Sequence, residues 1–200
     1  MLEEAMKQSR SEPYARLDAP KQQLGLILSP EPAYVYKPRQ DGSGAALKLD
    51  LRLKPVYNDK GYIQAVEGGL FLELAAQTGK GEDGYARFGW QDAGRLTAKL
   101  GVPDISALLL GFRYVRHLEK KLPEAIRSKG DQEGTTLGLF HRFGEATTAI
   151  DIKFTGDGSF VRVSRSKTSY RSIKLSLTEE LAVETYLQMA LRAFLSVGAR

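Results

Sequence analysis

Hydrophobic and polar residues alternate strictly along residues 45–54. A repeat of two residues is typical of a β-strand that buries one face and exposes the other. Leucine occupies every odd position from 47 to 53, so this side is expected to face the core. The other side is expected to be solvated and mostly cationic. It holds Lys48, Asp50, Arg52 and Lys54.

The same period predicts further strands in the first half of the chain. The glycine-containing loop 38–44 indicates a hairpin between the first two strands. In the third strand Phe71 falls on the solvated side, and the fourth strand is expected to be interrupted near Gly94. The four predicted strands are 33–37, 45–54, 69–77 and 85–99.

From Pro103 onward the spacing becomes helical, because hydrophobic residues recur at helical intervals from Ile105 to Val115. Pro123 is expected to end this helix, and one further short turn is expected before Gly130.

After Gly130 the period of two returns and predicts a second group of strands. The turn residues 156–158 indicate a hairpin between the middle two. Thr178 is expected to cap a final helix with an acidic first turn, and Gly198 follows its end. The predicted strands are 135–143, 147–154, 159–167 and 169–177.

The order of elements is therefore about four strands, a helix, about four strands and a helix. We expect an α+β fold in which two roughly four-stranded antiparallel β-sheets pack with helices, in the order ββββα-ββββα. A chain of 200 residues with 42% hydrophobic residues suits one core, so residues 33–200 are predicted to form a single domain. Residues 1–32 contain four prolines and are expected to form an irregular arm.

The amino-acid composition limits the expected compartment, partners and types of functional site. A net charge of +5 is a weak indication of an anionic partner, and the absence of cysteine excludes a disulfide framework or a thiolate site. No apolar run approaches the roughly 20 residues of a membrane span, and the first ten residues are too polar for a signal peptide. We therefore expect a soluble, intracellular protein of the cytoplasm, the nucleoid or an organelle, without a membrane partner.

Cations concentrate in residues 162–174, which hold five basic residues and no acidic one. Cations that contact phosphates and rings that stack on bases are what sequence-tolerant binding of single-stranded nucleic acid requires. The alternatives are that such residues keep a sheet soluble, or protect an exposed edge strand from aberrant pairing. Besides Lys48, Arg52 and Lys54, the candidates are Tyr36, Lys37, Phe71, Arg87, Trp90, Lys153, Phe160, Arg162, Arg165, Lys167, Tyr170, Arg171 and Lys174.

Other chemistry has little support in the sequence. Two histidines without cysteine give no metal-ligand spacing, and residues 79–84 contain Gly-Lys-Gly but lack the P-loop arrangement. No nucleophile with a base and no pair of carboxylates stands out. We therefore expect no enzyme activity, no cofactor and no metal. Trp90 has a second interpretation, as a core anchor near a turn.

Several short motifs occur in an order that resembles the Whirly family of single-stranded-DNA-binding proteins. This family belongs to a wider group that includes the positive-cofactor-four coactivators and the mitochondrial guide-RNA-binding proteins. Tyr36-Lys37 followed by Ala-Ala-Leu at 45–47 resembles the Whirly signature Tyr-Lys-Gly-x-Ala-Ala-Leu, and 69–72 resembles the glycine-led third strand. Trp90-Gln91, 139–141, 149–153, 156–158 and the final helix follow the family's order, so the resemblance covers most of 33–198.

The resemblance implies a homotetramer that binds single-stranded DNA largely without sequence preference, in replication, repair or transcription. One departure is that residues 38–44 lengthen the first loop, and Gly42 and Gly44 replace the motif lysines that support larger assembly in the family. The last helix is apolar on more than one side, at Leu181 among others, which agrees with subunit contact.

The sequence thus predicts an oligomer that binds single-stranded DNA through a basic and aromatic sheet surface. Two alternatives remain open. The first is an RNA-binding or annealing factor, or a transcription coactivator, of the same fold. The second is a purely structural oligomer whose basic strands hold acidic residues of a neighbour.

Overall fold

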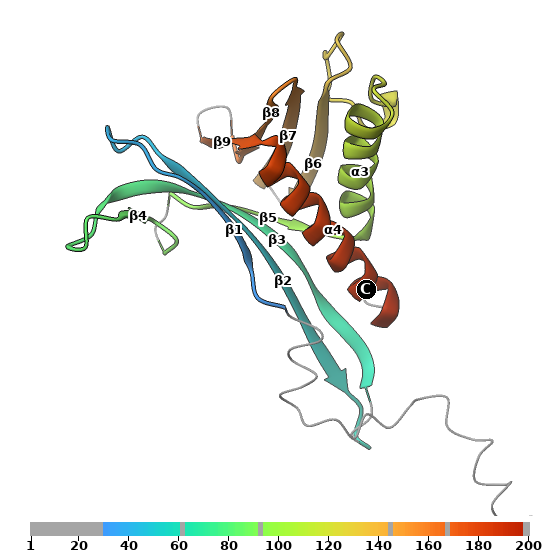
Figure 1. Ribbon diagram of the computed structural model, residues 1–200. Helices are drawn as coiled ribbons and strands as arrows, with labels where there is room; N and C mark the ends of the chain where they lie inside the picture. The colour runs from blue at the N-terminus through green and yellow to red at the C-terminus, as the bar shows by residue number, and fades with distance from the viewer. Residues whose placement is uncertain (1–29, 61–62, 92–93, 144–145, 167–168, 198–200) are drawn as a thin grey trace, which may run out of the picture.

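The computed structural model describes residues 30–60, 63–91, 94–143, 146–166 and 169–197 (Figure 1). Lys167 and nearly all of the expected arm, residues 1–29, therefore lie outside the described residues. The described chain is α+β, with two antiparallel sheets and two α-helices, which confirms the expected fold class.

The first sheet has five strands, one more than the sequence predicted. The expected strand 85–99 consists of two strands, β4 and β5, and both pair with β3. With 18 residues, β3 is long enough to pair with β4 near one end and with β5 in its middle. The path along the sheet is β1-β2-β3-β4, and β5 also pairs with β3. The strands are β1 Ala33–Lys37, β2 Ala45–Tyr57, β3 Ile63–Lys80, β4 Ala86–Phe88 and β5 Leu96–Leu100.

The second sheet has four strands in chain order, as expected. The predicted turn between β7 and β8 is confirmed. It needs a glycine at its end, because Gly158 has φ of 144° and a side chain there would collide with the backbone carbonyl of Leu175. The strands are β6 Thr136–Phe143, β7 Ala146–Thr155, β8 Gly158–Ser164 and β9 Tyr170–Ser176.

A helix follows each sheet. The first, α3 at Val102–Phe112, continues as the π-helix η1 at Arg113–His117, and the short 3₁₀ helix η2 follows at Glu124–Ile126. The last helix, α4, spans Leu177–Val197. Within the described chain no helix is long and apolar enough to cross a membrane.

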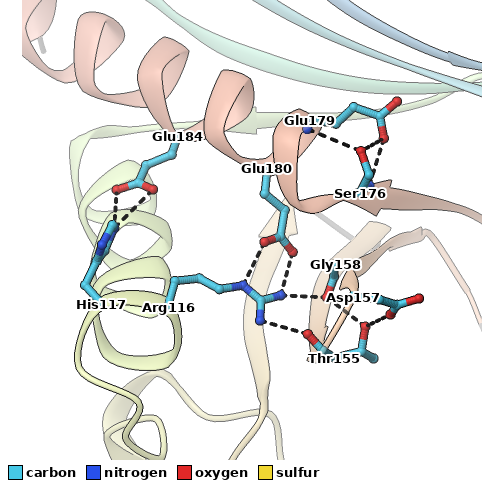
Figure 2. Close-up of polar contacts among 9 residues, drawn as sticks. All are labelled: Arg116, His117, Thr155, Asp157, Gly158, Ser176, Glu179, Glu180 and Glu184. Atoms are coloured by element: carbon cyan, nitrogen blue, oxygen red, sulfur yellow. Dashed lines mark hydrogen bonds and ion pairs between the residues drawn. The ribbon is translucent and has the colours of Figure 1, made fainter.

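The sequence predicted Thr178 as the N-cap of α4. In the structure Ser176 caps this helix instead. The Ser176 hydroxyl accepts a hydrogen bond from the Glu179 backbone amide at 3.4 Å, while the Glu179 carboxylate accepts one from the Ser176 amide at 2.8 Å (Figure 2). This reciprocal capping box satisfies amides that the first helical turn leaves free.

The core lies between the inner faces of the sheets and the two helices. In Figure 1, α4 runs across one face of the first sheet, and α3 packs beside it. The odd-numbered leucines of β2 are buried, as the alternation predicted. Tyr186 of α4 joins this helix to the first sheet, because its hydroxyl accepts a hydrogen bond from the Leu51 amide at 3.2 Å.

A buried ion pair joins the second sheet to both helices (Figure 2). The guanidinium of Arg116 donates to both carboxylate oxygens of Glu180, at 2.7 and 2.8 Å. It also donates to the carbonyl oxygens of Thr155 and Gly158, at 2.8 and 2.6 Å, at the turn between β7 and β8. Because Glu180 is only 3% exposed, this arrangement, called here the Arg116 clamp, holds a charge that would otherwise be buried without a partner.

Candidate nucleic-acid interface

The outward face of the second sheet, which points away from the helices, carries rings between cations. Phe160 on β8 lies between Lys174 of β9 and Lys153 of β7 in the register of the sheet. The Lys174 ammonium is 5.6 Å from the centroid of the Phe160 ring. Phe160 is 43% exposed, so its ring is open to a stacking partner.

The next rows of this face repeat the arrangement. The guanidinium of Arg162 lies over the Tyr170 ring, 4.3 Å from its centroid, and Tyr170 is 48% exposed. Phe140 on β6 is 71% exposed and shares the face, since it pairs with Ala149, which in turn pairs with Ser164 opposite Tyr170. Phe140 was not among the predicted ring residues.

One acidic residue lies within this face, because Asp151 of β7 is half-buried opposite Arg162 and accepts a hydrogen bond from the Ser128 hydroxyl at 3.0 Å. The lysines of the face form exposed pairs with acids. Lys153 is 3.9 Å from Glu133, and Lys174 is 2.5 Å from Asp157, with all four side chains at least 46% exposed. Hydrogen bonding to Lys174 lowers the pKa of Asp157. Exposed pairs of this kind are screened by water and salt and contribute little, so the lysines remain available to another anion.

The outward face of the first sheet is charge-compensated, so the expectation of a solvated, mostly cationic face on β2 is wrong at its centre. Asp50 is 8% exposed and binds Lys48 at 2.7 Å and Arg52 at 2.6 Å. Glu73 on β3 is 2% exposed and lies 3.1 Å from Arg52 and 3.6 Å from Arg95. Burial raises the pKa of Asp50, but hydrogen bonds from Lys48 and Arg52 outweigh it and lower the pKa overall.

Aromatic side chains form a cluster at one end of this first face. Tyr34 and Tyr36 stack with ring centroids 5.6 Å apart, Trp90 meets the Tyr34 ring edge-on at 5.8 Å, and Phe88 lies 5.3 Å from Tyr36. Burial, and then the neighbouring Tyr34, raise the pKa of Tyr36. Trp90 is half-buried in this ring cluster and is not a core anchor.

The remaining first-sheet candidates are scattered. Phe71 is half-buried, and the Arg52 guanidinium covers its ring at 4.7 Å. Lys54 is exposed further along β2, and Arg87 is exposed on β4. Lys37 has its side chain directed to the opposite face, where it pairs with Glu179 of α4 at 2.6 Å.

The five-cation segment 162–174 does not form one patch. Arg162 and Lys174 lie on the outward face, while Arg165 is exposed beyond the end of β8. Arg171 lies on the inner side of β9, because it pairs with Val163, which is fully buried. Its Nη1 atom donates a hydrogen bond to the Tyr170 carbonyl oxygen at 3.0 Å. Lys167 lies outside the described residues.

Two further observations concern the identity of the site. Among the described residues no group of three or more His, Cys, Asp or Glu side chains is placed to hold a metal ion. In comparisons with protein-family models and with curated proteins, no family model and no curated protein matches this chain.

Proposed function

We propose that this protein binds single-stranded DNA, largely without sequence preference, and acts by binding and not by catalysis. The observation that carries the proposal is the outward face of the second sheet, where exposed rings alternate with cations across neighbouring strands. Phosphate contacts from the cations and stacking on the rings are both independent of base identity. The resemblance to Whirly proteins supports the same function, which requires a compartment that contains nucleic acid.

The ring cluster on the first sheet offers a second stacking surface. Its tyrosines are nearly half exposed, at 43% for Tyr34 and 48% for Tyr36. Trp90 packs against Tyr34 and is the only tryptophan of the chain. Its fluorescence therefore reports on binding at the first sheet without an added label.

We further propose that α4 pairs with the same helix of a second copy, and that the assembly is a homotetramer. Leu177, Leu181, Thr185 and Met189 recur at intervals of four residues and share one helix face. Leu181 is 62% exposed, and the face lines an apolar groove that includes Tyr186. The Thr185 hydroxyl already donates to the Leu181 carbonyl oxygen at 2.7 Å, so covering this face leaves no unpaired hydroxyl proton.

The proposed function is tested by titrating a labelled single-stranded oligonucleotide while its anisotropy and the Trp90 fluorescence are both followed. We expect affinity to fall with salt, with a slope of about −0.7 per phosphate contact. Single-stranded RNA and duplex DNA of the same sequence serve as competitors. Affinity that ignores salt, or preference for the duplex, would contradict the proposal, whereas preference for RNA would favour the RNA-binding alternative.

The assembly is tested separately by light scattering on L181E and on L187A. Leu187 is buried in the core of the protomer, so L187A should lower stability while the oligomer persists. L181E should lower the mass of the assembly while the protein remains folded. If both variants keep the mass of the unmodified protein, the helix pairing is wrong.

A further inference from the structure

A groove of about 580 Å³ separates the β1–β2 hairpin from β9. One wall carries Lys37 and Arg39, and the other carries Ser172 and Lys174. Because Lys174 also lies beside the Phe160 ring, the groove opens directly beside the outward face of the second sheet. On the other wall, Lys37 follows Tyr36 of the ring cluster in the chain.

The loop that carries Arg39 is held in a defined conformation. Gln77 of β3 is 9% exposed and accepts a hydrogen bond from the Arg39 amide at 2.9 Å, while its own amide group donates to the Arg39 carbonyl oxygen at 3.1 Å. A side chain at Gly44 would collide with Gln77 and with the Lys37 backbone. A lysine therefore does not fit at position 44, and Arg39 supplies the cation of this loop.

Both lysines of the groove are already engaged by carboxylates of the same chain. Lys37 is 2.6 Å from Glu179, and Lys174 is 2.5 Å from Asp157. Hydrogen bonds from Lys37 and Ser176 outweigh the burial that raises the pKa of Glu179, so this pKa is lowered overall and the group is charged at neutral pH. Two anionic groups thus stand where the lysines would meet a phosphate.

We propose that this groove is an anion-exchange site, in which a backbone phosphate of the bound strand replaces Asp157 and Glu179 as the partner of Lys174 and Lys37. The inference rests on the proposed function and adds a regulatory element to it. The Lys174–Asp157 pair is exposed and the Lys37–Glu179 pair is partly exposed, so water and salt screen both pairs and the carboxylates weaken phosphate binding without preventing it. A single phosphate with few contacts is then disfavoured, while a strand that also stacks on Phe160 displaces the acids.

The exchange is tested with variants that remove the negative charge but keep the hydrogen bonds. E179Q retains an oxygen that accepts from Ser176, and D157N retains one that accepts from Thr155. E184Q is the matched control, because it makes the same change of net charge on α4 but Glu184 faces His117 at 3.3 Å (Figure 2).

We expect E179Q and D157N each to raise oligonucleotide affinity about two- to fivefold, because each removes a carboxylate that competes with the phosphate for its lysine. R39Q should lower affinity, and E184Q should leave it nearly unchanged. If E179Q and D157N behave like E184Q while F160A still weakens binding, the exchange site is wrong and the proposed function stands.

A second measurement does not depend on the oligonucleotide. Amide NMR of the full chain with a deoxynucleoside monophosphate should give shifts in residues 37–45 and 172–176, which grow in E179Q. Shifts spread over unrelated lysines would overturn the groove as a phosphate site. If the oligonucleotide does not bind but these shifts appear, the proposed function fails and the anion site remains.

Discussion

The outward faces of the two sheets have the same alternating pattern but differ in how their cations are paired. On the first sheet, Asp50 and Glu73 are buried and hold Lys48, Arg52 and Arg95 in a compact network. On the second sheet, Arg162 lies over the Tyr170 ring, the neighbouring Asp151 accepts a hydrogen bond from Ser128, and Lys153 and Lys174 form exposed pairs. The comparison teaches that the number of cations on a face matters less than whether acids of neighbouring strands already occupy them.

The rings differ in the same way. On the first sheet four rings pack against one another, so part of each ring is used within the protein. On the second sheet Phe160, Tyr170 and Phe140 stand apart and are between 43% and 71% exposed. The second face is therefore the better primary binding surface, and the first is the more rigid support.

The largest effect is expected from the contacts that anchor each sheet to α4. R116A leaves Glu180 buried without its partner and should lower the free energy of unfolding by about 3–5 kcal/mol. Y186F removes one hydrogen bond to Leu51 on the first sheet and should cost about 1 kcal/mol. Denaturant unfolding measures both, with R113A, an exposed arginine of the same segment, as the control. Equal losses for R116A and R113A would refute the clamp.

The next largest effect is expected from removing exposed rings, and it should differ between the two faces. F160A and Y170A should each weaken oligonucleotide binding by about 1–3 kcal/mol, because each ring loses one stacked base. F71A on the first sheet is the matched change, and it should weaken binding less because Phe71 is half-buried, whereas Phe160 and Tyr170 are exposed. Anisotropy titrations at one salt concentration decide this. A greater loss for F71A would reverse the assignment of the primary face.

Removing cations should change the salt dependence of binding on one face only. The double variant R162A/K153A should reduce the slope of log affinity against log salt by about 1.4, which corresponds to two phosphate contacts. K48A should change the slope little, since the Lys48 ammonium already binds Asp50 and its side chain is only 16% exposed. Similar slopes for both variants would remove the distinction between the faces.

The smallest effect concerns the acid dependence of the first sheet. The pKa of Asp50 in the folded chain lies below its ordinary value of 3.8, so the carboxylate adds stability that is fully present above this value. That contribution is lost as the pH falls from about 4 through the folded pKa. D50N should make unfolding less pH-dependent in this range and leave the dependence above pH 5 unchanged. An unaltered profile would contradict the lowered pKa.

The parts of the fold that depend on local period were predictable. The alternation in 45–54 placed the leucines of β2 correctly, and the turn residues at 156–158 marked the hairpin of β7 and β8. The division of 85–99 into two strands was not predicted, because it follows from the length of β3 and its pairing with both.

The candidate site was predictable only where one strand determines it. Arg171 shares its parity with the buried Ile173 and Leu175, so its inward placement was visible in the sequence and was overlooked. Tyr34 and Tyr36 are two residues apart on β1, so their shared face was also visible in the sequence. The role of Glu73 was not visible, since it depends on the register that puts it opposite Lys48 on another strand. Phe140 alternates with Leu137 and Leu139, so its outward placement was visible as well, and only its row with Tyr170 needed the register of the sheet.

The π-helical turn at the end of α3 sets the direction of Arg116. Each residue of an α-helix rotates the side-chain direction by about 100°, and a π-turn amounts to one inserted residue. Deleting one residue in 113–115 would restore α geometry and swing the guanidinium a quarter-turn or more away from Glu180, Thr155 and Gly158. The contact between η1 and the second sheet thus depends on the number of residues in this turn as well as on the arginine side chain. Shortening this turn by one residue should be as damaging as replacing the arginine.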